Sequence, residues 1–437
     1  MSVTVPPLKI EILNTGNELM LGFRLNTHQQ WLGRRLSDHG YQVSRQVSIP
    51  DNGPAIEAAV QESLARADLI ITTGGLGPTS DDITRDLIAG LLKRELRMDA
   101  NTLRRLDEFF AARQRETPER VKVQAQRPEG AIVLQNDHGT APGLAIEIAP
   151  NPFREDGRAA WLIMLPGPPR ELYPMFDDLV IPLLKRELPL GHEYICRNLR
   201  TTGLGESLVE ESLSGALSHL TEDGLEVHYC LSPGGVDVRL ACDGPLAEKT
   251  VQTADRIARE EIGKIIFGTG DDSLEECVVN SLAETGNTLA LAESCTGGLI
   301  SHRVTNISGA SKVLLAGFVT YSNEAKQKSL GVRSETLAEH GAVSEAVARE
   351  MAQGARRETG ADYAIAVTGI AGPTGGTPEK PIGTVFIGLA SPQKTLVMKF
   401  LNPFDRETFK QITSQQALEM LRRRILKNAQ RQKNPNA

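Results

Sequence analysis

The chain has 437 residues, which is too many for one hydrophobic core, so two or three domains are expected. Its formal net charge of −7 argues against non-specific binding to nucleic acid, because nothing offsets the repulsion from phosphate groups. The five cysteines are odd in number and form no C-x-x-C pair: Cys196, Cys230, Cys242, Cys277 and Cys295. This pattern indicates reduced thiols and disfavours both a disulfide framework and a structural zinc site.

Neither end of the sequence predicts a membrane or nucleic-acid role. Residues 1–12 lack a basic segment followed by an apolar core, and no apolar run approaches the length that spans a bilayer. We therefore expect a soluble, cytoplasmic protein with no membrane and no nucleic-acid partner. One basic run near the C-terminus is typical of a cation-rich helix end, with a binding arm as the alternative. It consists of Arg422, Arg423, Arg424, Lys427, Arg431 and Lys433.

The first part of the chain alternates short apolar strands with helical patterns. Strands are expected at residues 8–13, 43–49, 68–73 and 161–165, and helices at 27–39, 56–65, from 82 onward and at 170–188. This alternation predicts an α/β domain over residues 1–180, with a parallel sheet covered by helices on both faces.

The pattern changes twice after residue 180. A strand, a helix, a hairpin and a second helix over residues 190–268 predict a small α+β connecting domain, and its lack of a G-x-x-G clamp leaves a nucleic-acid role unsupported. Residues 272–430 predict a second α/β domain. Strands are expected there at 288–292, 313–321, 364–368 and in a hairpin over 384–401, and helices at 274–284, from 299 onward, at 344–358 and at 406–427.

The most informative motif is Ala292-Glu-Ser-Cys-Thr-Gly-Gly298, an apolar strand that runs into a small-residue turn and a helix. A hydroxyl at such a turn lies beside a helix N-terminus, whose free N–H groups can hold an oxyanion. Ser294 is therefore a candidate nucleophile for acyl transfer. Lys326 is the candidate base, because a desolvated lysine can be neutral near pH 7, and Tyr321 is expected to relay the proton or hold the lysine. The alternative is that Lys326 is solvated and Tyr321 is a core aromatic.

Other residues complete this predicted site. Cys295 is a rival nucleophile, but neighbouring side chains point apart, so only one of the two can face the cleft. Backbone N–H donors and close approach are expected from Thr296, Gly297 and Gly298. A second small-residue loop follows a strand and suits an anion or an amide; its candidate binding residues are Thr368, Gly369, Ala371 and Gly372. Arg406 is expected to clamp a phosphate.

The N-terminal domain carries a different set of strand ends. The sequence Gly74-Gly-Leu-Gly-Pro-Thr-Ser-Asp-Asp82 closes a buried strand and matches neither G-x-G-x-x-G nor G-x-x-x-x-G-K. It is expected at the carboxyl edge of the sheet, where open α/β sheets bind ligands. Candidate ligand-binding residues on this rim are Gly74, Gly75, Gly77, Thr79, Gly167 and Glu171, and candidate ligands of a magnesium-like ion are Glu18, Asp81 and Asp82. A helix N-cap is the alternative role for Asp82.

The C-terminal motifs resemble those of the CinA competence/damage-inducible family. The resemblance rests on residues 292–298, 317–326, 341–345, 368–376 and 380–384, in this order within residues 272–425. That domain is similar to nicotinamide-nucleotide amidases, which hydrolyse nicotinamide mononucleotide to nicotinate mononucleotide and ammonia. The resemblance implies that Ser294 is the nucleophile, Lys326 the base, Tyr321 its partner and Arg406 a residue near the phosphate, with no cofactor for the amidase.

The N-terminal motifs look like the molybdopterin-binding-like domain of the same family, a three-layer α/β fold. The pattern lies in residues 73–84, 138–143 and 165–172. In relatives this domain is associated with metal-dependent hydrolysis of ADP-ribose, whereas the wider fold binds molybdopterin. The resemblance thus implies an enzyme of pyridine-nucleotide salvage that uses small nucleotides and forms a homodimer. The alternatives are a nucleotide-sensing adaptor without turnover and a pterin-binding protein.

Overall fold

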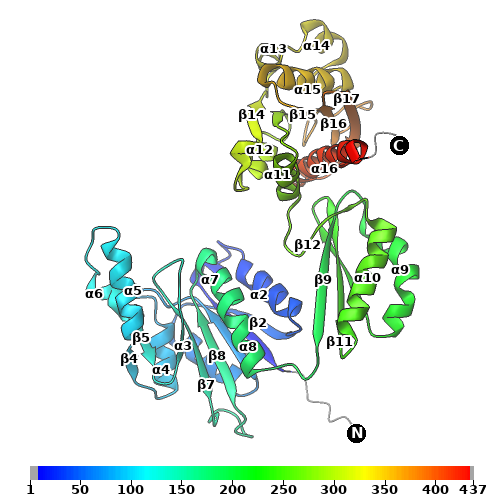
Figure 1. The fold of residues 1–437 in the computed structure, drawn as a ribbon. Coiled ribbons are helices and arrows are strands. Elements are labelled where there is room, and N and C mark those ends of the chain that lie inside the picture. Colours follow the sequence, from blue (N-terminus) through cyan, green and yellow to red (C-terminus); the bar gives the residue numbers. More distant parts are fainter. Residues whose placement is uncertain (1–7, 434–437) are drawn as a thin grey trace. The chain divides into compact units, whose positions relative to one another are not determined.

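The computed structural model describes the backbone of residues 8–433 and the side chains of residues 8–430 (Figure 1). The predictions that concern residues 1–7 and the side chains of Arg431 and Lys433 lie outside the described residues. The chain divides into two compact units, one formed by residues 1–196 and 243–247 and the other by residues 197–242 and 248–437. The division into domains at 1–180, 190–268 and 272–430 stays a prediction.

The first unit is built on a six-stranded sheet with the order β2-β1-β3-β8-β7-β6. Its strands are β1 (Ile10–Thr15), β2 (Val43–Ile49), β3 (Leu69–Thr73), β6 (Ile132–Leu134), β7 (Gly143–Ile148) and β8 (Ala160–Leu165). The four predicted strands are β1, β2, β3 and β8, and they are parallel. The strands β6 and β7 were not predicted and run antiparallel, so the sheet is mixed rather than parallel.

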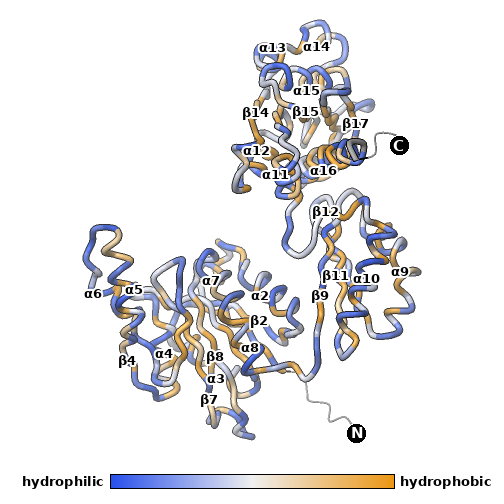
Figure 2. The backbone as a smooth tube through the Cα atoms, viewed as in Figure 1, coloured by the Kyte–Doolittle hydropathy of each residue, from blue (hydrophilic) through white to orange (hydrophobic). Residues whose placement is uncertain are grey.

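Helices cover both faces of this sheet, as predicted. One face carries α2 (Thr27–Asp38), α7 (Pro169–Met175), a π-helical segment (Phe176–Val180) and α8 (Ile181–Glu187), and the other carries α3 (Gly53–Leu64) and α4 (Thr84–Leu91). Alternate residues of β1 enter the two cores, Ile10 and Ile12 on one face and Leu13 on the other. Figure 2 shows β7 and β8 as hydrophobic segments, as expected for strands buried on both faces.

The first unit also contains elements that the sequence did not reveal. These are α1 (Asn17–Met20), β4 (Leu96–Met98), α5 (Ala100–Ala111), α6 (Glu119–Lys122), a 3-10 turn (Val123–Ala125) and β5 (Gln126–Pro128). The strands β4 and β5 pair only with each other. Only three buried residues, Leu106, Val121 and Ala125, form the hydrophobic cluster of residues 96–128. So few buried residues leave little apolar periodicity in the sequence.

The second unit holds a four-stranded antiparallel sheet and the C-terminal sheet. The smaller sheet has the order β10-β11-β9-β12 and packs with two helices. Its elements are β9 (Tyr194–Thr201), α9 (Glu206–Glu222), β10 (Glu226–Ser232), β11 (Gly235–Asp243), α10 (Ala247–Ile262) and β12 (Ile266–Thr269). The first five agree with the predicted strand, helix, hairpin and helix, whereas β12 was not predicted.

The C-terminal sheet has the order β14-β13-β15-β16-β17, with the first three strands parallel. Its strands are β13 (Leu289–Glu293), β14 (Leu314–Val319), β15 (Tyr363–Gly369), β16 (Thr384–Ala390) and β17 (Thr395–Leu401). One face packs on α11 (Leu274–Glu284), α12 (Leu299–Thr305) and α16 (Arg406–Lys433), and the other on α13 (Asn323–Leu330), α14 (Ser334–His340) and α15 (Glu345–Thr359). A 3-10 turn (Ala310–Lys312) precedes β14. No helix in the described part of the chain is long and apolar enough to cross a membrane.

Candidate active site in the C-terminal sheet

Ser294 follows β13, which is buried along its whole length between β14 and β15. Alternate residues of a strand face opposite sides, and here Leu289 and Leu291 enter the core beneath α12, whereas Ala290 and Ala292 enter the core beneath α13 and α15. The N–H of Ser294 donates to the carbonyl of Val367 at 3.1 Å, which keeps this residue in the sheet. Continuing the alternation directs the Ser294 side chain toward α13.

Lys326 is held against Ser294 by α13. The helix begins at a cap in which the side chain of Ser322 accepts from the N–H of Ala325, and Lys326 and Leu330 are its buried residues, one turn apart. The side chain of Lys326 is only 1% exposed, and its Nζ lies 3.2 Å from the Ser294 Oγ. The alternative that Lys326 is solvated is therefore wrong.

Burial disfavours the charged form of the Lys326 amine. Burial lowers the pKa of Lys326 from its ordinary value of 10.5. The amine donates to the carbonyls of Thr320 at 2.8 Å and Tyr321 at 3.3 Å. A neutral amine has two N–H bonds, so these two carbonyls leave its lone pair directed at the third neighbour, the Ser294 hydroxyl. This is the arrangement of a base that accepts the proton of a nucleophile.

Tyr321 does not fill the role expected of its side chain. The residue follows β14 and is 62% exposed, so it is not a core aromatic. Its backbone carbonyl, not its phenol, holds Lys326, and its hydroxyl accepts a hydrogen bond of 2.7 Å from the Nη2 of Arg406. The prediction that the phenol relays a proton to Lys326 does not agree with this geometry.

Cys295 points away from Ser294, as the alternation of a strand requires. Its side chain is 6% exposed and belongs to the core beneath α12. Burial raises the pKa of the Cys295 thiol to about 12, so the thiolate is scarce at neutral pH. The rival hypothesis of a cysteine nucleophile therefore finds no support.

Glu293 is the most important residue that sequence reasoning missed. Its carboxylate is 1% exposed and accepts five hydrogen bonds of 2.7 to 3.0 Å from the loop and from the first turn of α12. The donors are the Thr296 Oγ1, the N–H groups of Gly298, Ile300 and Ser301, and the Ser301 Oγ. An acid at the end of a buried strand and just before a helix start was the available signal.

The loop after Ser294 uses its glycines differently from the prediction. The N–H of Gly297 donates to the Ser294 carbonyl at 3.1 Å, and the N–H of Gly298 donates to Glu293. Both glycines have positive φ angles, 62° and 97°, which a side chain would oppose. Within the described residues, the N–H groups of Cys295 and Thr296 are hydrogen-bonded to no other residue.

The second predicted loop lies at the end of β15 and is anchored from two sides. The Thr368 Oγ1 donates to the Ala342 carbonyl at 2.8 Å, and a Cβ on Gly369 would meet the Thr384 carbonyl at 2.8 Å, so only glycine fits there. Ala371 is buried. The Nη1 of Arg406 donates to the Gly372 carbonyl at 3.0 Å while its Nη2 binds Tyr321, so this exposed guanidinium joins both loops.

The N-terminal rim forms a second cleft, with a volume of about 570 Å³. Six of the predicted residues line it, namely Glu18, Gly74, Gly75, Asp81, Asp82 and Gly167. Three others lie behind it: Gly77 and Thr79 contact the carboxylate of Asp82, and Glu171 is buried, where it accepts a hydrogen bond of 2.7 Å from Asn136. Asp82 is not a helix cap, because α4 begins at Thr84. The Asp82 carboxylate instead accepts a hydrogen bond from the Thr79 N–H.

The carboxylates of this cleft repel one another. Asp51, which sequence reasoning missed, also lines it, and burial and the charges of Glu18 and Asp81 raise its pKa, opposed by hydrogen bonds from Thr15 and Asn17. Among the described residues no three His, Cys, Asp or Glu side chains are close enough to hold a metal ion by themselves. The oxygen donors nevertheless fit a Mg²⁺-like ion, which commonly uses one or two carboxylates together with phosphate oxygens.

His28 is another unpredicted residue of the N-terminal cleft. Its Nε2 lies 2.6 Å from the Gly167 carbonyl, and its buried Nδ1 has no partner in the part of the chain that the structure describes. Burial lowers the pKa of His28, partly offset by its hydrogen bond to Gly167. The neutral ring thus donates through Nε2 and presents Nδ1 as an acceptor at the cleft.

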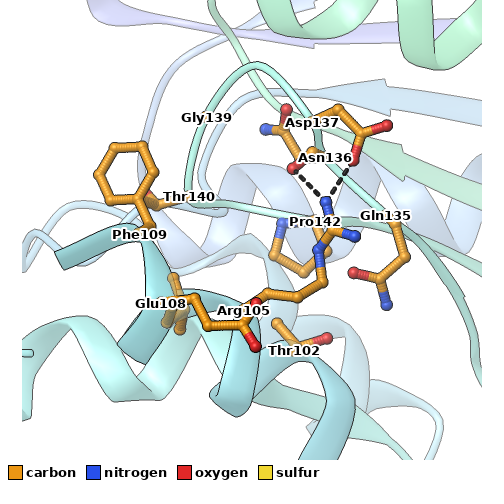
Figure 3. Close-up of a pocket in the computed structure, with 11 residues that line it drawn as sticks. Thr102, Arg105, Glu108, Phe109, Gln135, Asn136, Asp137, Gly139, Thr140 and Pro142 are labelled. Atoms are coloured by element: carbon orange, nitrogen blue, oxygen red, sulfur yellow. Dashed lines mark hydrogen bonds and ion pairs between the residues drawn. The ribbon is translucent and has the colours of Figure 1, made fainter. Parts of the chain in front are cut away.

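A third hollow, of about 270 Å³, lies between α5 and the loop over residues 135–142 (Figure 3). Arg105 extends across it from α5 and binds both the Asp137 carboxylate and the Asn136 carbonyl. Since Asn136 also binds Glu171, the loop is fixed from both sides. The Arg105 guanidinium is therefore already used in holding α5 to this loop.

Comparison with known proteins connects these two sites to one family. The family described as "CinA C-terminal domain" matches residues 271–425, and the one described as "Probable molybdopterin binding domain" matches residues 11–186. A CinA-like protein of Kosmotoga olearia is 42% identical over 96% of this chain and 99% of its own length. The chain belongs to the CinA family.

A second relative agrees with this assignment, and a solved structure is also similar in sequence. A CinA-like protein of Akkermansia muciniphila is 42% identical over 94% of this chain and 96% of its own length. The crystal structure of the competence/damage-inducible protein from Agrobacterium tumefaciens is 43% identical, with a TM-score of 0.33, and covers 34% of this chain and 91% of its own. The CinA-family resemblance predicted from the sequence motifs is confirmed, and so is the α/β fold class with a molybdopterin-binding-like first domain.

Proposed function

We propose that the C-terminal site is a serine amidase that hydrolyses nicotinamide mononucleotide to nicotinate mononucleotide and ammonia. The observation that carries this proposal is the distance of 3.2 Å between the Lys326 Nζ and the Ser294 Oγ, at a lysine that is 1% exposed. A lysine with a lowered pKa and within hydrogen-bond reach of a serine hydroxyl has the two properties that a base for this nucleophile needs. Membership of the CinA family supports the choice of substrate.

The proposed reaction uses one proton carrier for both steps. Neutral Lys326 accepts the Ser294 proton while the Ser294 Oγ attacks the carboxamide carbon, and the carbonyl electron pair moves onto oxygen. The tetrahedral intermediate collapses, the C–N bond breaks, and Lys326 returns the proton to the leaving nitrogen, which departs as ammonia. Water then attacks the acyl-serine with Lys326 again as base and releases the carboxylate. No metal is required, because the dyad supplies both the nucleophile and the base.

The surrounding loops support a nucleotide substrate. Arg406 lies at the mouth of the site and joins the loops that carry Tyr321 and Gly372. A phosphate of the substrate would replace the Tyr321 hydroxyl as the partner of the exposed guanidinium. The exposed Tyr321 ring would then be available to contact the pyridine ring.

The test is ammonia release from nicotinamide mononucleotide by the wild type and by Ser294→Ala, Lys326→Ala and Lys328→Ala. Lys328 is an exposed lysine of the same helix and serves as the matched control. We expect turnover by the wild type and by Lys328→Ala only. An inert wild type at high enzyme concentration would instead favour the adaptor without turnover.

We further propose that the N-terminal cleft hydrolyses ADP-ribose at its pyrophosphate. The specific observation is the gathering of Gly74, Gly75 and Gly167 with the carboxylates of Glu18, Asp81 and Asp82 around one cleft. The glycine backbones admit phosphate groups closely, and the carboxylates would hold a Mg²⁺-like ion. Such an ion, when bound, neutralises the charge of the pyrophosphate and polarises it for attack by water.

ADP-ribose turnover with and without Mg²⁺ or Mn²⁺ tests this second activity. Release of AMP that needs the divalent ion supports it. Retention of a pterin without any pyrophosphate cleavage would favour the pterin-binding alternative. We also propose a homodimer by analogy with the family, which light scattering of the eluted protein would test.

A further inference from the structure

The N-terminus of α12, where the sequence predicts that the oxyanion binds, is already filled. Helix N-termini attract anions through their free N–H groups and their dipole. Here the anion is the chain's own Glu293 carboxylate, which accepts from the N–H groups of Gly298, Ile300 and Ser301. At 1% exposure it is sealed from solvent and from any substrate. A substrate oxyanion must therefore find other donors.

Two N–H groups beside Ser294 remain available. The turn that follows Ser294 is closed by the Gly297 N–H bound to the Ser294 carbonyl, which places residues 295 and 296 at its centre. Neither N–H group is hydrogen-bonded to another residue within residues 8–433. Successive N–H groups in a turn form a concave anion site, and in acyl-transfer enzymes such a site lies immediately beside the nucleophile.

We propose that the backbone N–H groups of Cys295 and Thr296 form the oxyanion hole and that Glu293 is the positioning residue that fixes them. This inference rests on the proposed amidase function. Glu293 acts from two directions, because it binds the Thr296 Oγ1 and, four and five residues further on, the N–H groups of Ile300 and Ser301 at the start of α12. The central residues of the turn are thereby clamped between the sheet and the helix. Glu293 touches no reacting atom, and its effect passes through the backbone.

The direct test uses a phosphonate ester of an aromatic alcohol, which phosphonylates an activated serine and leaves an oxygen where the oxyanion forms. In a crystal structure of the adduct on Ser294 we expect this oxygen at about 2.7–3.1 Å from the N atoms of Cys295 and Thr296. An oxygen bound instead at the N–H groups of residues 369–372, or at α12 with Glu293 displaced, would overturn the assignment while leaving the serine nucleophile intact. If Ser294 is never phosphonylated, the amidase proposal fails and the inference fails with it.

Kinetics of Glu293→Gln separate positioning from mere stability. The glutamine side chain keeps the shape of Glu293, but its NH2 group cannot accept hydrogen bonds as the second carboxylate oxygen does. The turn that contains residues 295 and 296 should therefore be held less firmly. We expect kcat to fall about 100-fold with KM nearly unchanged, as for an interaction made only in the transition state. A rise in KM at constant kcat, or an unchanged rate, would contradict the positioning role.

A milder variant covers the case in which Glu293→Gln fails to fold. Thr296→Val removes only the hydroxyl that binds Glu293 and should lower kcat about tenfold at constant KM, and Thr296→Ser should recover most of the loss. Thr305→Ala, on the exposed side of the same helix, is the control for general effects on α12 and should leave kcat unchanged. Equal losses in Thr296→Val and Thr305→Ala would show that only helix stability matters.

Discussion

The two candidate sites lie at the ends of strands in similar α/β sheets but are prepared for chemistry to different degrees. In the C-terminal site, the nucleophile and base are buried and in contact, at 3.2 Å. In the N-terminal cleft, Glu18 and Asp81 are exposed, and the charges of both help to raise the pKa of Asp51. The proposed nucleophile and base of the first site are already in contact, whereas the proposed activity of the second site needs a cation and a phosphate-containing substrate. In the proposed buried dyad the reacting groups are positioned by folding alone, whereas the proposed chemistry of the acidic cleft depends on the ligands that it binds.

The largest effect should come from replacing the buried base by an apolar side chain of similar length. Lys326→Met should lower the rate of amide hydrolysis by about 10⁴-fold, because Ser294 loses its proton acceptor. The same change should alter the melting temperature only slightly, because removal of a buried amine is offset by the loss of the donor to the Thr320 and Tyr321 carbonyls. Calorimetry and ammonia release on one preparation measure both. Loss of stability together with activity would mean that Lys326 holds the fold rather than the chemistry.

Replacing the carboxylates of the N-terminal cleft should lower the rate of ADP-ribose hydrolysis by weakening the binding of the divalent ion. Glu18→Gln and Asp81→Asn should each reduce ADP-ribose hydrolysis about 100-fold, with partial recovery at high Mg²⁺, because the ligands of the ion are weakened. Glu57→Gln, an exposed acid on α3, is the control. Ammonia release from nicotinamide mononucleotide should be unchanged in all three variants. A rate of ADP-ribose hydrolysis that does not change with the metal concentration would contradict the metal-dependent mechanism.

The pH dependence of the amidase should follow the protonation of Lys326. Burial lowers the pKa of Lys326 below 10.5, and the neutral amine is the active form, so kcat/KM of the amidase should rise tenfold per pH unit below that pKa and level off above it. Because the unfolded chain keeps its proton up to about pH 10.5, Lys326 also makes the folded state more stable as pH rises between these two pKa values. A pH–rate profile in which kcat/KM does not rise with pH below the pKa of Lys326 would show that Lys326 does not act as the neutral base.

The smallest effect is expected at the thiol next to the nucleophile. Burial raises the pKa of Cys295 to about 12, so iodoacetamide at pH 8 should leave this residue unmodified and the amidase active. Cys230 is exposed and should be alkylated first. Peptide mass spectrometry measures both modifications. Rapid alkylation of Cys295 with loss of activity would reopen the cysteine hypothesis.

The sequence revealed the parts of the molecule whose patterns are local. The strands β1, β3, β8 and β13 are apolar runs, and the helix α11 was predicted with its observed bounds, Leu274–Glu284. The region around α5 was missed because its few buried residues give no clear periodicity. The strand β7 is itself an apolar run that was overlooked, and β6 has only three residues, whereas the antiparallel direction of both is set by long-range pairing that no local pattern shows.

The candidate sites were predicted as far as residue identity permits. The contact between Ser294 and Lys326 was expected from their types and motif, but the burial of Lys326 depends on which face of α13 packs on the sheet. The roles of Tyr321 and Glu293 escaped prediction for the same reason. Only the fold shows that a carbonyl of Tyr321 replaces its phenol, and that the carboxylate of Glu293 takes the helix N-terminus.

The helix α16 has a consequence for the time at which activity appears during synthesis. Its first residue, Arg406, joins the two loops of the amidase site, and further along it Phe409, Leu418 and Leu421 fill the core beneath β13. These residues are translated long after Ser294 and Lys326, and domains fold as units during synthesis. A ribosome-bound chain that has not yet released residues 406–425 therefore carries its nucleophile and base without the core that aligns them. We therefore expect the proposed amidase activity to appear only after this last helix has docked.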